Sequence, residues 1–68
     1  MKLPQLNEVW THFKGEEYRI CAFAWCAVGA DLSLRVLYQK DGTTFSRTIS
    51  NFLEPVDGRP RFEYKGVL

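Results

Sequence analysis

The sequence predicts a mostly β protein: a small antiparallel SH3-like barrel of about five strands with one short helical turn. Its 68 residues suffice for one domain. Short runs rich in aromatic and β-branched residues alternate with glycine-containing turns. An aromatic content of 15% favours a dense core, which a chain this short needs for stability. We expect a lead-in over residues 1–7, a single β domain over residues 8–65 and a tail over residues 66–68.

The first two strands are predicted from a short aromatic run and a longer apolar run. Residues 9–13 form the first strand, and the turn at residues 14–17 contains Gly15, which can take a positive φ. Residues 18–26 contain neither glycine nor proline and are rich in aromatic residues, which predicts the second strand. A loop over residues 27–31 follows.

The remaining elements are indicated by alternation and by turn signals. Residues 32–39 begin with apolar and polar residues in alternation, and Asp41-Gly42 is a strong hairpin signal before a return strand at residues 43–47. Residues 50–54 form one helical turn, with Ser50 as its cap and Pro55 ending it. A last strand is expected over residues 61–65.

Strict alternation along the second strand gives it two faces that both need burial. One face carries Tyr18, Ile20, Ala22, Ala24 and Cys26, and the other carries Arg19, Cys21, Phe23 and Trp25. Leu37 would join Phe23 and Trp25 on the outside, beside Arg35. Such an exposed patch needs a cover or a purpose. The alternatives are cover by the chain itself, a homodimer through Phe23, Trp25 and Leu37, or a ligand surface.

The sequence indicates no catalytic or metal site and no cofactor. Cys21 and Cys26 are five residues apart, so a regular strand directs them to opposite faces. They can then neither share a metal ion nor form a disulfide without a bulge. His12 is the only histidine, and neither a phosphate-binding loop nor a nucleophile elbow is present.

The charge balance favours an ordinary soluble surface. Nine Lys+Arg residues against eight Asp+Glu give a net charge of +1, without the basic excess of a dedicated nucleic-acid binder. Residues 1–10 contain no apolar core of a signal peptide, and no apolar run approaches the length of a membrane span. We therefore expect no membrane association and a cytoplasmic location, in agreement with free thiols.

The spacing of several motifs resembles a family of short bacterial and phage proteins catalogued as domain of unknown function 1653. Trp10-Thr11-His12-Phe13-Lys14-Gly15-Glu16-Glu17-Tyr18 matches the first element of its pattern, and Val36-Leu37-Tyr38 fits the second. Phe45-Ser46-Arg47 with Phe52-Leu53-Glu54, and then Pro60-Arg61-Phe62, fit the rest. The resemblance covers about residues 8–64. Ala24-Trp25-Cys26-Ala27-Val28 lacks the histidine and acid that many relatives carry there, and Thr48 replaces a proline. The resemblance implies a compact mostly β cytosolic domain without annotated catalysis.

We therefore expect a binding module for a protein or small ligand, acting through an aromatic and arginine surface. The expected contact residues are Trp10, His12, Phe45 and Arg47, followed by Trp25 and Arg35. Aromatic rings would supply apolar contact area, and Arg47 would recognise an acceptor or anion. The alternative is a nucleic-acid-binding barrel using Arg35, Arg47, Arg59 and Arg61. A small enzyme is less favoured, because no acid–base partner is evident.

Overall fold

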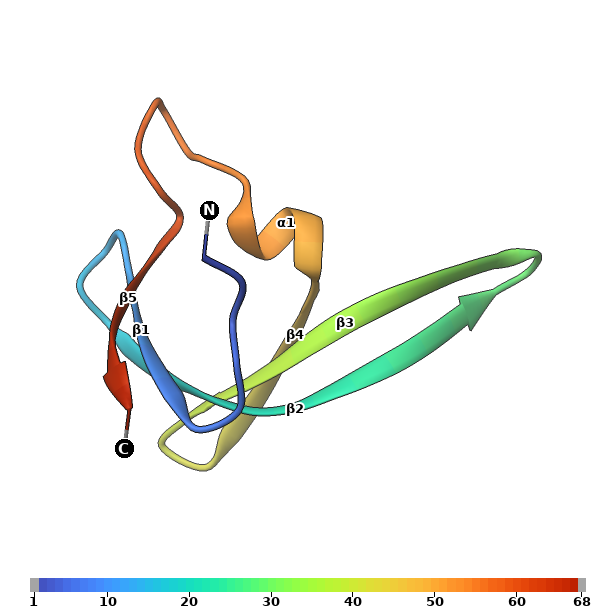
Figure 1. The fold of residues 1–68 in the computed structure, drawn as a ribbon, viewed down its shortest axis with the longest axis horizontal. Coiled ribbons are helices and arrows are strands. Elements are labelled where there is room, and N and C mark those ends of the chain that lie inside the picture. The colour runs from blue at the N-terminus through green and yellow to red at the C-terminus, as the bar shows by residue number, and fades with distance from the viewer. Residues whose placement is uncertain (1, 68) are drawn as a thin grey trace.

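The computed structural model describes residues 2–67 and contains one five-stranded antiparallel sheet with one short helix (Figure 1). The strands are β1 (Glu8–His12), β2 (Glu17–Val28), β3 (Asp31–Lys40), β4 (Thr43–Thr48) and β5 (Phe62–Val67), and the helix is α1 (Ile49–Leu53). Their order in the sheet is β4-β3-β2-β1-β5, so that β4 and β5 are its edges. The prediction of a mostly β fold is confirmed, whereas the sheet is not closed into a barrel.

The turn chemistry of the sequence accounts for the β3–β4 hairpin. Asp41 and Gly42 both have positive φ, at 51° and 79°, which is the backbone that a two-residue turn of type I′ requires. Lys40 pairs with Thr43 directly across this turn. The predicted hairpin is confirmed at this position.

Several predicted boundaries need correction; the predicted loop over residues 27–31, for example, shortens to Gly29 and Ala30. The side chain of Thr48, rather than that of Ser50, caps α1 by accepting a hydrogen bond from the Asn51 N–H. This cap starts the helix one residue earlier, at Ile49. The last strand extends through Val67, because β5 continues to pair with β1 beyond Lys65, with Val9 opposite Gly66. Residues 66 and 67 therefore belong to the sheet rather than to a tail.

A β-bulge in β2 overturns the predicted division of its faces. Ile20 pairs with Tyr38, but the next pairs are Ala22 with Leu37 and Phe23 with Val36, so Cys21 is an extra residue. The extra residue inverts the alternation from there on. Phe23 therefore shares the core face of the sheet with Ile20.

Trp25 lies on that same core face, since it pairs with Leu34, two residues from buried Val36. Leu37, which pairs with Ala22, lies on the opposite face. A single outer patch of Phe23, Trp25 and Leu37 is therefore not formed.

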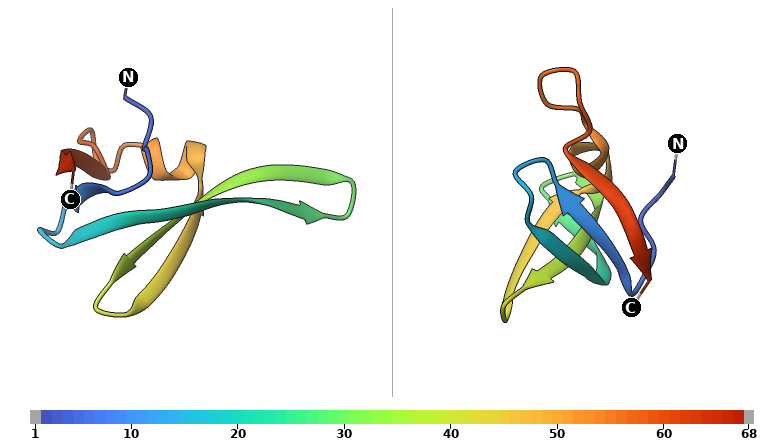
Figure 2. Two further views of the ribbon diagram at one scale, coloured as in Figure 1. Left: turned by 60° about the horizontal axis from the view of Figure 1, so that its bottom comes forward. Right: turned by 90° about the vertical axis from the view of Figure 1, so that its left-hand side faces the viewer.

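The core lies between the curved sheet and α1, and it is mainly aromatic. Phe52 of α1 is fully buried; its ring stacks on that of Phe62 with centroids 4.2 Å apart and meets the ring of Trp10 edge-on at 5.4 Å. The two further views show α1 placed over the sheet, at the end of β4, from which it continues (Figure 2). Burial of these rings against one another supplies the apolar area that holds the open sheet together.

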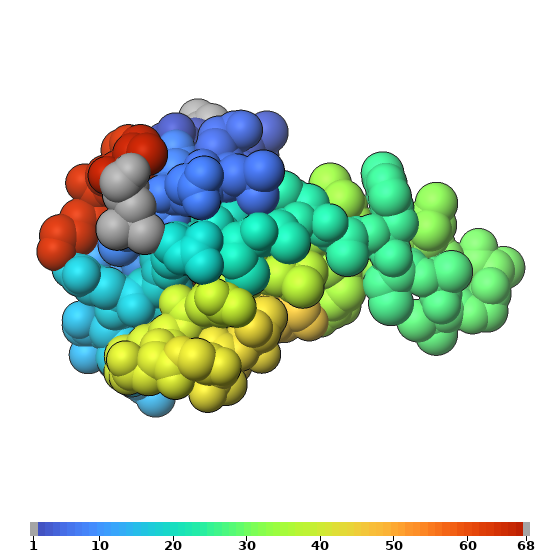
Figure 3. All heavy atoms as spheres, turned by 90° about the horizontal axis from the view of Figure 1, so that it is seen from below, coloured from blue at the N-terminus to red at the C-terminus, as the bar shows by residue number. Residues whose placement is uncertain are grey.

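The second half of β2 and the first half of β3 project from this body as a two-stranded arm (Figure 1). β1 pairs with β2 only as far as Arg19, and β4 pairs with β3 only from Arg35 onward. We call residues 21–34 the β2–β3 arm. It stands clear of the rest of the molecule in the space-filling view as well (Figure 3).

Candidate functional site: an aromatic–arginine groove at the sheet edge

A groove of about 440 Å³ lies where edge strand β4 meets β3 and the start of α1. We call it the aromatic–arginine groove; Arg35, Tyr38, Phe45, Ser46, Arg47, Thr48 and Asn51 line it. The register brings these side chains together, because Phe45 pairs with Tyr38 and Arg47 pairs with Val36. The chain passes directly from β4 into α1, and this connection adds Asn51, one helical turn beyond Arg47, to the lining of the groove.

Arg47 is held in place by neutral partners. Its Nε donates to the Tyr38 hydroxyl at 2.9 Å, and one terminal nitrogen donates to the Asn51 side-chain oxygen at 2.5 Å. Its other terminal nitrogen has no hydrogen-bond partner among residues 2–67. An arginine positioned by neutral groups keeps its full positive charge available for an anion.

Aromatic rings extend the groove toward β2. The Phe45 ring is 40% exposed and stacks on that of Tyr38 with centroids 5.7 Å apart and a 21° interplanar angle. Tyr18 meets Phe45 edge-on, with centroids 5.7 Å apart. This arrangement leaves one face of Phe45 available for contact with an apolar or planar group.

His12 is linked to these rings through Phe62, whose ring contacts those of Tyr18 and Tyr38. Its ring meets that of Phe62 edge-on at 5.0 Å, and Nδ1 accepts a hydrogen bond from the Lys14 N–H at 3.2 Å. Burial lowers the pKa of His12, and the charges of Lys14, Arg47 and Arg61 lower it further, against an opposing effect of Glu16. The imidazole is therefore neutral near pH 7, and its surroundings are electrically positive.

The arginines have no acidic partners within the part of the chain that the structure describes. The ion pairs there use Lys2 with Glu8, Lys40 with Glu16 and Asp41, and Lys65 with Glu17. None of the five arginines forms an ion pair with a carboxylate of residues 2–67. Arg61 is the clearest case, since its Nε is buried without a hydrogen-bond partner. Guanidinium groups without an acidic partner can donate hydrogen bonds to carboxylate or phosphate oxygens of a ligand.

The residues expected to bind a ligand separate into three places. Phe45, Arg47 and Arg35 line the aromatic–arginine groove, and His12 lies outside its lining but close enough for the charge of Arg47 to lower its pKa. Arg35 belongs to the opposite face of the sheet by register, and its guanidinium reaches the rim of the groove by donating to Ser46 Oγ at 3.2 Å.

Trp10 and Trp25 lie elsewhere. Trp10 is only 4% exposed, and its indole N–H donates to Glu8 at 3.1 Å, so its ring is part of the core. Trp25 is 68% exposed on the β2–β3 arm. Neither tryptophan therefore contributes to the aromatic–arginine groove.

Sequence reasoning missed Tyr18 and Asn51 as neighbours of the site. Tyr18 could have been found from its position opposite Trp10 at the start of a strand, which directs it toward the core face. Asn51 lies four residues after Arg47, a spacing that brings two side chains together only once the helix start is known. Arg61 was expected only as a contact of the nucleic-acid alternative, and no local signal indicated that its Nε would be buried.

The described part of the chain holds no cluster of metal-ligating residues. Residues 2–67 contain no group of three or more His, Cys, Asp or Glu side chains placed to bind one ion. Cys21 and Cys26 are both free thiols, and the Cys21 thiol contacts the Leu37 carbonyl oxygen at 3.4 Å. Within the same residues, the only helix is too short to cross a membrane.

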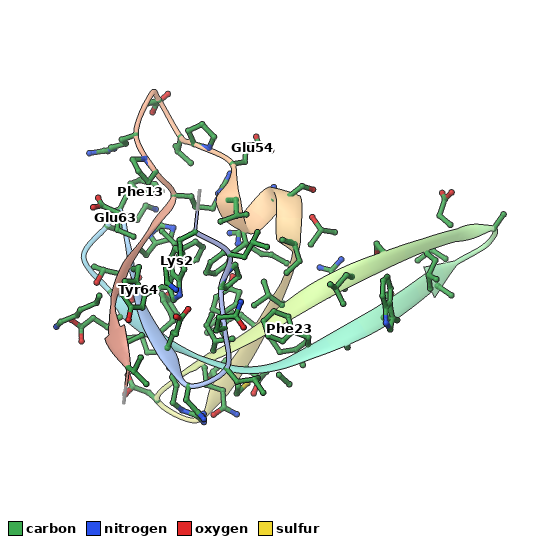
Figure 4. All side chains as sticks on the ribbon, in the orientation of Figure 1. Lys2, Phe13, Phe23, Glu54, Glu63 and Tyr64 are labelled. Atoms are coloured by element: carbon green, nitrogen blue, oxygen red, sulfur yellow. The ribbon has the colours of Figure 1, made fainter. Side chains whose placement is uncertain are left out.

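A second groove, of about 490 Å³, lies between β1, β5 and the segment after α1. Trp10, Pro55, Pro60, Phe62 and Tyr64 line it. Lys2 lies 4.5 Å from the centre of the Tyr64 ring, and Figure 4 shows these two side chains next to each other. This groove is more apolar, and the cation at its rim already pairs with Glu8.

Comparison of this chain with models of protein families, with curated proteins and with solved structures finds no match.

Proposed function

We propose that this protein is a small binding module whose ligand is an anionic group attached to an apolar or planar one. The observation that carries the proposal is the pairing of Arg47 with exposed Phe45 in one groove. Arg47 is held by Tyr38 and Asn51 without a carboxylate partner. Phe45 supplies the apolar contact beside it. The anionic group would belong to a partner protein or to a small ligand.

The proposal includes an SH3-like arrangement of the strands, which the strand order supports. β5 returns after the helical turn to pair with β1, while β1 to β4 follow each other in the sheet. The resemblance to the domain of unknown function 1653 family is likewise proposed; four of the residues that carry it, His12, Tyr18, Phe45 and Arg47, lie at or beside the groove. Free thiols at Cys21 and Cys26 support a cytoplasmic location.

Benzenesulfonate is a suitable probe, because it joins a flat ring to a permanent negative charge. We expect a titration followed by ¹⁵N NMR to shift the amide signals of β4 and of the start of α1, with a Kd in the roughly millimolar range of small fragments. Phe45→Ala and Arg47→Gln should each weaken binding about tenfold, and Arg47→Lys should weaken it less than Arg47→Gln.

Tyr64→Ala is the matched control, since Tyr64 is 43% exposed and Phe45 is 40% exposed. Binding in this variant should equal that of the wild type, and benzyl alcohol, a neutral probe, should bind more weakly. Equal binding by wild type and Arg47→Gln would overturn the proposal. Loss of binding in Tyr64→Ala alone would move the site to the second groove.

Nucleic-acid binding through Arg35, Arg47, Arg59 and Arg61 is the alternative. Two of these arginines, Arg35 and Arg47, line one groove, while Arg59 lies over the Phe13 ring at 4.9 Å. Titration with a single-stranded oligonucleotide at two salt concentrations tests it. A steep fall of log affinity with log salt would favour this alternative over the small anionic ligand.

A further inference from the structure

The β2–β3 arm is the largest feature of the molecule that the proposed function leaves without a role. Residues 22–28 of β2 pair with β3 on one side and, among the residues that the structure describes, with no strand on the other. Asn7, which donates to the Ile20 carbonyl oxygen, is the last contact along that side. The edge of β2 from Ala22 to Val28 therefore offers unpaired backbone N–H and C=O groups.

One face of the arm continues the core face of the sheet but has no cover. The cross-strand pairs on it are Phe23 with Val36, Trp25 with Leu34 and Ala27 with Leu32. Val36 is buried under the body of the molecule, Phe23 is partly exposed at the root of the arm (Figure 4), and Trp25 and Leu32 are mostly exposed. Exposure thus rises along a single apolar stripe from the core to the tip.

The chemistry of the arm specifies what can dock on it. No Lys, Arg, Asp or Glu occurs between Ile20 and Ala30. A charged partner strand would lose hydration at this edge and gain no ion pair. The edge also lacks the charges, prolines and inward-pointing polar residues by which exposed strands usually resist pairing. A fitting partner is an uncharged strand with aromatic and small residues, and β2 itself has this composition.

We propose that a second copy of this chain occupies the arm, with the two β2 edges paired antiparallel about a two-fold axis at Trp25. An antiparallel pair of identical strands satisfies its own hydrogen bonds by symmetry. Centring the free edge places Trp25 opposite Trp25 of the second copy and Phe23 opposite Ala27 of the second copy, so that the two Trp25 rings meet at the axis and each Phe23 ring meets a small side chain. Each chain has a single such β2 edge, which closes the assembly at two copies.

The exposed apolar surface is large enough for this contact. Phe23, Trp25, Val28 and Leu32 are 36%, 68%, 69% and 65% exposed. Together they leave on the order of 450 Å² open per copy, given the usual areas of such side chains. Two copies then contribute about 900 Å², close to the roughly 1,000 Å² of a specific interface before the paired backbones are included. Pairing would also support a two-stranded ribbon that is marginal alone in water.

Light scattering and sedimentation of the wild type and of two charge variants test the proposal. The wild type should have twice the 7.9 kDa mass of one chain. Trp25→Glu and Trp25→Lys should each halve the observed mass, because like charges would meet at the two-fold axis. An equal mixture of the two variants should recover the dimer mass, since opposite charges then meet. Val67→Glu, a similarly exposed residue on β5, should leave the mass unchanged.

Several outcomes would overturn the proposal. If the folded wild type stays monomeric at millimolar concentration, a second copy does not occupy the arm. Cosedimentation of that monomer with phosphatidylcholine vesicles would assign the arm to a lipid surface instead. If Trp25→Glu remains dimeric, the dimer interface lies elsewhere on the molecule. A mass that increases without limit indicates open-ended aggregation rather than a two-fold pair. Far-ultraviolet circular dichroism confirms that each variant is folded.

Discussion

Glu8 shows at the scale of one residue how this small core tolerates a charge. Its side chain is buried and accepts hydrogen bonds from the Gln5 N–H at 2.8 Å and from the Trp10 indole N–H at 3.1 Å, while Lys2 lies 2.8 Å away. Burial alone would raise the pKa of Glu8, but these three donors together hold it below its usual value. Glu8 therefore ties the lead-in to β1.

The first prediction concerns Glu8→Gln. We expect it to lower the free energy of unfolding at pH 7 by about 1–2 kcal/mol, because hydrogen bonds to a charged acceptor are replaced by weaker ones. The pKa of Glu8 is lower in the folded than in the unfolded state. Its contribution is therefore fully present above about pH 4.5 and is lost as the pH falls through the folded-state pKa.

Urea unfolding at pH 7 and pH 3 measures this prediction. The difference between wild type and Glu8→Gln should be smaller at pH 3. Glu63→Gln, at an exposed position of β5, is the control and should change the stability little at either pH. An equal difference at both pH values would contradict this account of Glu8.

Residue-scale roles were only partly predictable from the sequence. Phe45 and Arg47 were expected to form a contact surface, and the register of β3 with β4 does place both in one groove. Trp10 was expected there too, but its position opposite Tyr18 and beside Glu8 places it in the core. Composition cannot separate a core ring from a surface ring when both lie on short strands; the register of the strands decides.

At the scale of the element, the bulge at Cys21 decides what the arm presents. Residues 18–26 alternate so regularly that no bulge is expected from their pattern. The structure nevertheless inserts Cys21 between the Ile20–Tyr38 and Ala22–Leu37 pairs. The insertion directs Phe23 to the core face, where it extends the core toward the tip. The β3–β4 turn, by contrast, was predictable, because Asp41-Gly42 is a local sequence signal for a hairpin.

Deletion of Cys21 provides a second prediction. Because Cys21 is the extra residue, its removal should restore a regular ladder and keep Trp25 opposite Leu34. Deletion of Ala24, the matched control, should instead force Phe23 to the other face and cost about 1–2 kcal/mol more stability, since Phe23 then loses its partial burial. Nuclear Overhauser contacts between Trp25 and Leu34 give the readout. Their loss on deletion of Cys21 would contradict the assigned bulge.

At the scale of the whole molecule, an open sheet and an aromatic core take the place of a closed barrel. Phe52 of α1 contacts rings from β1, β3 and β5, so the helix links β3 to two strands with which β3 does not pair in the sheet. The number of strands, their antiparallel pairing and the helical turn followed from local signals, whereas the order of the strands in the sheet did not. Closure did not, because it depends on the curvature accumulated over the whole sheet.

The same arrangement gathers positive charge around His12, which makes this residue a reporter for the proposed ligand. β1 supplies His12, the following turn supplies Lys14, β4 supplies Arg47 and the segment before β5 supplies Arg61. A bound anion would stabilise the imidazolium and raise the pKa of His12. Without a ligand, that pKa lies below 6.5, so the contribution of His12 to stability is fully present above pH 6.5 and is lost at lower pH.

The most direct measurement is therefore an NMR titration of the His12 ring protons over pH 4–8, without and with saturating benzenesulfonate. We predict a pKa below 6.5 for the free protein, a rise when the probe binds, and a much smaller rise in Arg47→Gln. A free-protein pKa of 6.5 or above that the probe leaves unchanged, in both wild type and variant, would contradict an anion-binding groove at this edge of the sheet.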